Sequence, residues 1–217
     1  MYHTFMHAVD AVDNGVEVAD SCRYRDATDL SSRVKRLNPR WNEGPSTSSD
    51  EDVRFEAASN MCGDDFASSL DYLVECELEA RGHVESALLA RPVGTPVLDE
   101  IVTFGDGGMP WKSHLYALEE KHGCEGSVKF VLYTDQSSMW RVQAVTVKGT
   151  AFTNRVGLLA EWRGVRDADL ESLCGIKGAK FVHASGFIGG CATREGAMEM
   201  AVKSIMRARE EEAAKGK

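Results

Sequence analysis

The spacing of apolar residues divides the chain into a helical first part and a second part of short strands and helices. Helices are predicted over residues 2–13, 28–37 and about 50–91, where apolar side chains recur three or four positions apart. Ser49 precedes the longest of these helices and is its expected N-cap. Its apolar spacing predicts a buried face made of Phe66, Leu70, Leu73, Val74, Leu78, Val84 and Leu88.

After Pro96 the pattern changes to short strands separated by turns and helices. Strands are predicted over 97–104, 128–134, 139–147 and 179–184, and helices over 110–122, 167–173 and 193–212. Because only the polar turn 135–138 separates two of these strands, they should pair antiparallel.

Together these elements predict an α/β fold. We expect a mixed, partly antiparallel sheet covered by helices, preceded by an N-terminal helical portion and a long linker helix. The Pro- and Gly-rich stretch after Arg91 predicts a boundary between two domains, residues 1–92 and 93–217.

The composition fits a soluble globular chain, since 43% of the 217 residues are hydrophobic and 27% are charged. No apolar run approaches the ~20 residues that a membrane span needs. The first residues lack the basic-then-apolar pattern of a secretory signal, so no targeting segment is expected in this chain. The six cysteines contain no C-x-x-C pair, which predicts free thiols and an intracellular, reducing compartment.

The net charge of −9 is concentrated in one segment. Residues 50–80 hold ten carboxylates against Arg54 alone, whereas residues 22–41 hold six basic residues against two acids. The overall acidity therefore does not exclude an anionic partner elsewhere on the chain. Because ten carboxylates cannot be buried without partners, we expect the long helix to expose its acidic face.

A glycine-rich segment between a predicted strand and the last helix has the residue types of a phosphate-binding turn. Glycines let a backbone approach a ligand, a helix N-terminus favours anions, and arginine can grip a phosphate with two hydrogen bonds. The candidate substrate-binding residues are His183, Ser185, Gly186, Gly189, Gly190, Thr193 and Arg194. We expect the turn 185–190 to be exposed and concave, with its amides and Arg194 facing the same cavity as His183. The alternative is a tight turn that needs glycine for structural reasons alone.

Two further groups of candidate residues lie in the first part of the chain. Asp10 and Asp13 share a helix face and could bind a hard metal ion together, or could cap the helix end. Such a pair cannot hold a catalytic Mg²⁺ or Mn²⁺ without other ligands. Arg33, Arg36 and Trp41 suit backbone phosphates and base stacking, with a solvated helix face and a core tryptophan as the alternative.

Distinctive motifs follow one another along nearly the whole chain. They are DAVDNG at 10–15, LSSRVKRLNPRWN at 30–42, PWKSHL at 110–115, VLYTDQ at 131–136, WRVQ at 140–143, EWRGVRD at 161–167, FVHASGFIGG at 181–190 and TREGA at 193–197. In these motifs the chain resembles the C-terminal half of the melanocyte-proliferating-gene family of exonucleases, a branch of the DHH phosphoesterase superfamily.

The resemblance implies a metal-dependent 3′-to-5′ RNA exonuclease of the nucleus and mitochondrion. In the superfamily, an N-terminal catalytic lobe carries His- and Asp-rich motifs for Mn²⁺ or Mg²⁺, and a C-terminal lobe supplies a substrate clamp with a Gly-Gly pair. This sequence has no Asp-His-His and no His-x-Asp-x-Asp motif. The resemblance therefore implies that a missing N-terminal lobe is a partner of this chain, and that Asp10 or Asp13 is the last metal ligand.

These expectations combine into one interpretation and one alternative. The chain is expected to be the substrate-binding part of a metal-dependent phosphodiesterase, to bind single-stranded RNA or nucleotide phosphates, and to be inactive as a nuclease by itself. The alternative is a non-catalytic regulatory module that binds nucleic acid or phosphate. No membrane is expected as a partner in either case.

Overall fold

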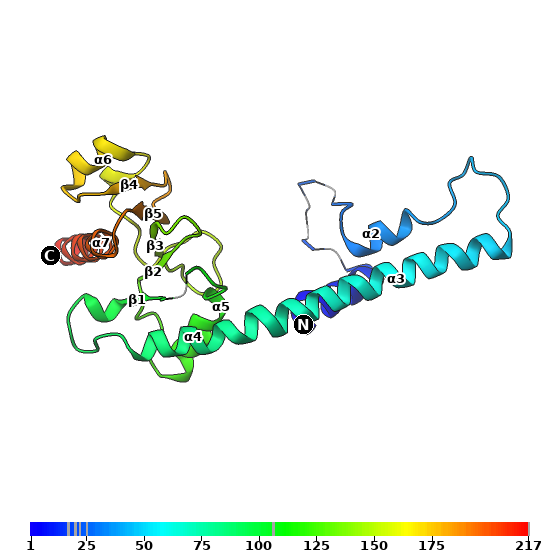
Figure 1. The fold of residues 1–217 in the computed structure, drawn as a ribbon, viewed down its shortest axis with the longest axis horizontal. Coiled ribbons are helices and arrows are strands. Elements are labelled where there is room, and N and C mark those ends of the chain that lie inside the picture. Colours follow the sequence, from blue (N-terminus) through cyan, green and yellow to red (C-terminus); the bar gives the residue numbers. More distant parts are fainter. Residues whose placement is uncertain (17, 20, 22, 25, 106, 217) are drawn as a thin grey trace. The chain divides into compact units, whose positions relative to one another are not determined.

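The computed structural model describes residues 1–16, 18–19, 21, 23–24, 26–105 and 107–216. The chain folds as two compact units, residues 1–77 and 78–217 (Figure 1). The boundary expected after residue 92 falls inside the second unit. This is because Val84 and Leu88, on helix α4 (Leu78–Leu89), share a buried cluster with residues of α5 (Lys112–Lys121).

The first unit is helical. Its elements are η1 (Tyr2–Met6), α1 (His7–Asp13), α2 (Leu30–Lys35), α3 (Ser48–Tyr72) and η2 (Leu73–Glu77). The expected N-cap Ser49 is wrong by two residues, because Thr47 and Asp50 form a capping box. The Thr47 hydroxyl accepts a hydrogen bond from the Asp50 amide, and the Asp50 carboxylate accepts one from the Thr47 amide.

The long helical region exposes its acidic side chains, as predicted. Of the ten carboxylates between residues 50 and 80, eight are exposed, and only Asp65 and Glu77 are half-buried. Asp65 accepts two hydrogen bonds from Arg33, at 2.6 Å from Nη1 and 3.0 Å from Nη2. The hydrogen bond from Arg33 lowers the pKa of the Asp65 carboxyl, and the pair joins α2 to α3.

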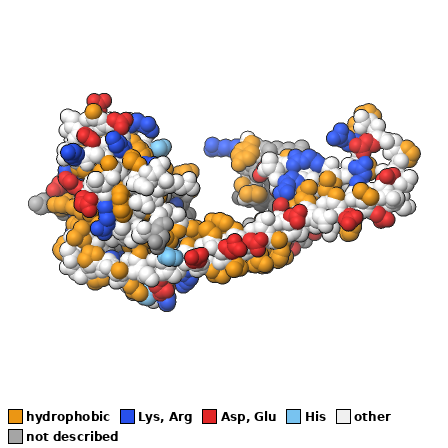
Figure 2. Space-filling model, in the orientation of Figure 1, with side chains coloured by type: hydrophobic (Ala, Val, Ile, Leu, Met, Phe, Trp, Pro, Cys, Tyr) orange, Lys and Arg blue, Asp and Glu red, His pale blue; other side chains and the backbone are white. Residues whose placement is uncertain are grey.

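The predicted buried face of this region is wrong over its first half. Phe66, Leu70, Val74 and Leu78 are each at least 40% exposed, and only Val84 and Leu88 are buried as expected. Among the residues of the first unit whose burial is described, none is buried. Figure 2 shows apolar side chains on the surface of the long helix beside acidic ones. Helical spacing identifies the apolar face of a helix, but that face is buried only where another element packs against it.

The second unit is an α/β fold built on a five-stranded mixed sheet, which confirms the predicted fold class. Its strands lie in the order β1-β2-β3-β5-β4; β1 and β2 run parallel, and the other neighbours pair antiparallel. The remaining elements, in chain order, are η3 (Leu98–Glu100), β1 (Ile101–Thr103), β2 (Phe130–Thr134), β3 (Trp140–Ala144), η4 (Ala160–Trp162), α6 (Asp167–Cys174), β4 (Ala179–Val182), β5 (Ile188–Cys191) and α7 (Arg194–Lys215). The predicted antiparallel pair appears as β2 and β3, with Leu132 opposite Val142.

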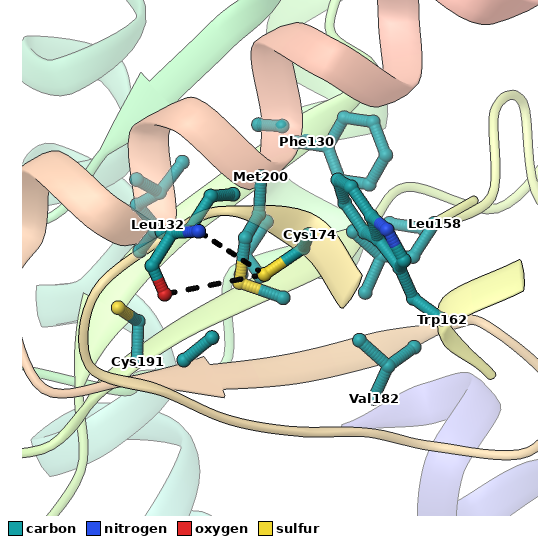
Figure 3. Close-up of a cluster of buried hydrophobic side chains, with 14 of the residues drawn as sticks. Phe130, Leu132, Leu158, Trp162, Cys174, Val182, Cys191 and Met200 are labelled. Carbon is teal, nitrogen blue, oxygen red and sulfur yellow. Dashed lines mark hydrogen bonds between the residues drawn. The ribbon is translucent and has the colours of Figure 1, made fainter. Parts of the chain in front are cut away.

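Alternating side chains build one core on each face of the sheet. On one face, Leu132, Val142 and Val182 belong to a buried cluster that includes Met200 of α7. Figure 3 shows part of this cluster, with Leu132, Val182 and Met200 labelled. On the other face, Val131 joins the cluster of α4 and α5 described above. The two faces are called here the α7 face and the opposite face.

The structure bears on two composition-based expectations. The thiols of Cys62, Cys76, Cys124, Cys174 and Cys191 are free, as predicted, and Cys22 lies outside the described residues. None of the helices in the described part of the chain has the length and apolar character to cross a membrane.

A buried ion pair ties α5 to the loops of the second unit. The Glu119 carboxylate, 1% exposed, accepts hydrogen bonds from Arg155 Nη1 and Nη2, both at 2.7 Å, and from the Val128 amide at 3.0 Å. We expect Glu119→Ala to lower the free energy of unfolding by about 3–5 kcal/mol, because Arg155 would remain buried without its partner. Urea unfolding measures this change.

The neighbouring Glu120 provides the control. Its carboxylate pairs with Lys148 at 2.8 Å, and both side chains are more than 60% exposed. Glu120→Ala should therefore shift the urea midpoint far less than Glu119→Ala does. Equal shifts in the two variants would contradict the structural role given to Glu119.

Candidate nucleic-acid interface

The glycine-rich segment forms a hairpin, not the open concave turn expected from the sequence. Residues 188–191 are strand β5, and Gly189 and Gly190 are buried between β3 and β4. Their amides belong to a strand in the interior of the sheet and do not form an exposed phosphate cradle. The expectation of an exposed turn over 185–190 is therefore wrong at 189 and 190.

The tight part of the hairpin lies at residues 183–186. The Gly186 amide donates to the His183 carbonyl at 2.8 Å, and Gly186 has a φ of +72°, which favours glycine. His183 Nδ1 lies 2.9 Å from the Ser185 hydroxyl and accepts from the Ser185 amide at 3.1 Å. These contacts bring His183, Ser185 and Gly186 together, and they support the structural alternative for Ser185 and Gly186. The exposed His183 ring also makes an edge contact with the ring of Phe187.

Gly189 and Gly190 allow close contacts on opposite faces of the sheet. A Cβ at Gly189 would lie 3.0 Å from side-chain atoms of Leu158 and Met200, on the α7 face. A Cβ at Gly190 would lie 2.5 Å from Arg141 Nη1 and 2.6 Å from Phe181 Cε1, on the opposite face. The missing side chain of Gly190 therefore gives Arg141 and Phe181 the space that they occupy.

Beyond the area packed on α4 and α5, the opposite face continues onto β3, β5 and β4 with polar and aromatic side chains. The half-buried side chains on this part of the face belong to Tyr133, Arg141, Gln143, Phe181 and Ile188, and with Gly190 they are called here the open sheet face. The Tyr133 hydroxyl donates to Gln143 Oε1 at 2.6 Å, and burial raises the pKa of this phenol. The open sheet face therefore combines aromatic rings with hydrogen-bonding groups.

Two guanidinium groups lie against the Phe181 ring. The Arg141 guanidinium carbon is 5.0 Å from the ring centre, and that of Arg166 is 5.8 Å from it. Arg141 Nη2 donates to Asp135, while its buried Nη1 has no hydrogen-bond partner in the described part of the chain. Burial acts to raise the pKa of the Asp135 carboxyl, but the Met139 and Ser137 amides and Arg141 outweigh it, so this pKa lies below its usual value.

Such a surface has the chemistry for binding single-stranded nucleic acid. A partly exposed ring flanked by guanidinium groups can stack on a base, and the cations can contact the backbone phosphates. Sequence reasoning did not select Arg141, Phe181 or Arg166 as site residues. The sequence does contain one indication of this face, because Arg141 and Gln143 alternate with apolar residues in β3. The contacts of Phe181 with Arg141 and Arg166, however, depend on how the strands pair in the fold.

Arg194 lines a cavity to which His183 does not contribute. Thr193 is the N-cap of α7, since its hydroxyl accepts from the Gly196 amide at 3.1 Å. Arg194, the first residue of this helix, lines a cavity of about 330 Å³ that includes none of residues 183–190. This cavity is therefore not the one that the sequence predicted Arg194 to share with His183.

The candidate metal residues lie on α1 in the first unit. Asp10 and Asp13 are exposed, and Asp10 Oδ1 accepts from the Asn14 side chain at 3.1 Å. Within the described residues, no group of three or more His, Cys, Asp or Glu side chains is placed to hold a metal ion. These two carboxylates alone do not fit a Mn²⁺ or Mg²⁺ site, and no catalytic step is assigned to them.

In the basic segment of the first unit, Arg33 and Arg36 contact other parts of the protein, and Trp41 is exposed. Arg33 is engaged by Asp65, and Arg36 Nη1 donates to the Ala27 carbonyl at 3.1 Å. Trp41 is 96% exposed, so the alternative of a core tryptophan is wrong. A second cavity of about 480 Å³ is lined by Lys35, Arg36, Asn38, Pro39 and Arg40.

Comparison with known proteins identifies the family. The profile of the MYG1 exonuclease family, described as "Uncharacterised protein family (UPF0160)", matches residues 1–205, and the chain belongs to this family. Among similar curated proteins are the MYG1 exonucleases of Bos taurus, 45% identical over 203 residues, and of Homo sapiens, 44% identical over 203 residues. The MYG1 protein YER156C of Saccharomyces cerevisiae is 35% identical over 221 residues.

The matches cover nearly all of this chain but only part of each relative. They include 93% of the chain in the two mammalian comparisons and 94% in the yeast one, against 52%, 53% and 62% of the bovine, human and yeast proteins. The chain thus spans about half the length of the mammalian relatives. No solved structure matches the chain significantly.

The contacts around Gly190 can be tested by adding one methyl group. We expect Gly190→Ala to lower the free energy of unfolding by about 1–3 kcal/mol, because the Cβ overlaps the Phe181 ring and the Arg141 guanidinium. Gly105→Ala is the control, since a Cβ there would meet no atom within 4 Å. Denaturant unfolding compares the two variants, and a Gly190→Ala protein as stable as Gly105→Ala would refute the close packing.

Proposed function

We propose that this chain is the substrate-binding part of a metal-dependent phosphodiesterase that resembles 3′-to-5′ RNA exonucleases of the DHH superfamily. In this proposal the chain corresponds to the C-terminal half of the enzyme, and single-stranded RNA lies on the open sheet face. The observation that carries the proposal is the half-buried Phe181 ring on that face, with the guanidinium carbons of Arg141 and Arg166 at 5.0 Å and 5.8 Å from its centre. Family membership supports the reaction class, because the mammalian relatives are named exonucleases.

The residues of the open sheet face have different roles in this proposal. Phe181 stacks on a base, and Arg166, which is exposed, contacts the phosphate backbone. Arg141 lies against the same ring and helps to position it, with its guanidinium carbon 5.0 Å from the ring centre. His183, two residues after Phe181, extends the interface into the hairpin. In the first unit, Lys35, Arg36 and Trp41 form a second contact region for RNA.

The metal chemistry is assigned mostly to the part of the enzyme that this chain does not span. Mn²⁺ or Mg²⁺ would supply activated water and charge neutralisation at the phosphodiester. Asp10 or Asp13 contributes one ligand in this proposal, and the other ligands lie outside the chain.

The base-stacking role of Phe181 gives the first test. We expect Phe181→Ala to weaken binding of a 5′-hydroxyl oligoadenylate by roughly 5- to 150-fold, the cost of losing one stacked base. Fluorescence anisotropy with a 3′-labelled strand measures the dissociation constant. Wild-type affinity should also fall as salt rises, because phosphate contacts release counterions.

Two variants separate stacking from general damage to the protein. Phe181→Tyr keeps the ring and should bind RNA within about twofold of the wild-type chain. Phe152→Ala removes an equally large ring that is 94% exposed and lies outside the open sheet face, so it should leave binding unchanged. If Phe152→Ala and Phe181→Ala weaken RNA binding equally, the open sheet face is not the interface.

The division of labour between the two parts of the enzyme gives the second test. The purified chain should bind single-stranded RNA without digesting it in Mn²⁺, whereas a longer chain that restores the remaining length of the relatives should digest it. In that longer chain, Asp10→Asn or Asp13→Asn should abolish most of the Mn²⁺-dependent activity. Asp71→Asn, which changes an exposed carboxylate on α3, should retain it.

The digestion experiment can contradict this division of labour in two ways. Digestion by the isolated chain would contradict the assignment of metal ligands to the missing part. RNA binding without cleavage by the longer chain would favour the alternative, a non-catalytic regulatory module.

A further inference from the structure

A cavity of about 330 Å³ lies within the second unit, between the end of α4, strand β1 and the start of α7. Its polar side chains belong to Arg91, Thr103 and Arg194, and it is called here the arginine pocket. The rest of the lining is apolar and consists of Ala87, Ala90, Pro92, Leu98, Ile101 and Met198. None of these residues belongs to the open sheet face.

The arginine pocket has an excess of positive charge. Two guanidinium groups line it, and no carboxylate does. Within the described part of the chain, Arg194 forms no ion pair. Arg91 Nη1 donates to the Ser127 hydroxyl at 2.8 Å, but its buried Nε has no hydrogen-bond partner. A buried donor without an acceptor costs free energy, which an anion in the pocket would recover.

The position of Arg194 reinforces this argument. It is the first residue of the 22-residue helix α7, where the helix dipole already provides partial positive charge. A cation at this end is unfavourable for the helix by itself, and an anionic ligand removes the conflict. The unpartnered Nε of Arg91 adds a second cationic group, which lies outside α7.

Charge and shape define the class of ligand. A phosphomonoester carries nearly two negative charges at neutral pH and can accept paired hydrogen bonds from both guanidinium groups. The apolar walls and the volume suit a small organic group attached to the phosphate. We infer that the arginine pocket binds a phosphomonoester such as a nucleoside monophosphate, at a site separate from the RNA interface.

Calorimetric titration of the whole chain with adenosine 5′-monophosphate tests this inference. The wild-type chain should bind the nucleotide, and adenosine, which lacks the phosphate, should not bind detectably. Arg194→Ala should weaken nucleotide binding by roughly tenfold or more, because it removes one charge-assisted contact. Arg207→Ala is the matched control, since it removes an arginine from the same helix outside the pocket, and it should leave binding unchanged.

A second titration distinguishes a free nucleotide from the end of a strand. If the ligand is a strand end, Arg194→Ala should weaken binding of a 5′-phosphorylated oligoadenylate but not of its 5′-hydroxyl form. If neither phosphorylated probe binds to the wild-type chain, or if Arg194→Ala and Arg207→Ala behave alike, the inference is overturned.

The same variants keep this inference distinct from the proposed function. Phe181→Ala should affect the 5′-hydroxyl RNA and leave the nucleotide unchanged, and Arg194→Ala should do the reverse. Equal loss of both ligands in Arg194→Ala would show one shared site and would overturn the separate pocket. If Phe181→Ala fails to weaken RNA binding while Arg194→Ala still weakens nucleotide binding, the proposed function is refuted and the inference about the arginine pocket holds.

Discussion

The second unit depends on two adjacent residues without side chains in the middle of its sheet. Gly189 and Gly190 point to opposite faces of β5, and each leaves room that a neighbouring side chain fills. On the α7 face this room lets Leu158 and Met200 approach the strand, and on the opposite face it lets Arg141 approach Phe181. The same dipeptide therefore serves the core and the candidate interface at once, because successive residues of a strand alternate between faces.

Acidic and basic side chains are distributed unevenly along the chain. Most carboxylates of the long helical region are exposed, whereas Arg141 and Arg166 lie at the open sheet face and Arg91 and Arg194 line the arginine pocket. The buried Glu119–Arg155 pair, in contrast, is hydrogen-bonded within the second unit and contributes to its packing.

The two units differ in how completely they bury their apolar residues. The second unit has a core on each face of its sheet, whereas none of the first-unit residues whose burial is described is buried. Apolar side chains remain exposed on the long helix: Phe55 is 76% exposed, and Phe66 is 41% exposed although its ring contacts that of Phe5. This agrees with a chain that spans about half the length of its mammalian relatives.

The sequence by itself determined the local features of this protein. Alternation and a short polar turn predicted the antiparallel pair β2–β3, and the density of carboxylates required their exposure. These features depend on neighbours within a few residues, so their physical causes can be identified in the sequence.

Tertiary structure decided which surfaces became buried and which side chains came together. The apolar spacing at Phe66 and Leu70 looks the same as that at Val84 and Leu88, but only the latter pair is buried, in a cluster with helix α5. Likewise, Gly189 and Gly190 form an inner strand because β3 and β4 supply hydrogen bonds on both sides, and Arg141 reaches Phe181 only through that pairing. Contacts between residues 40 positions apart depend on strand order, which local spacing does not encode.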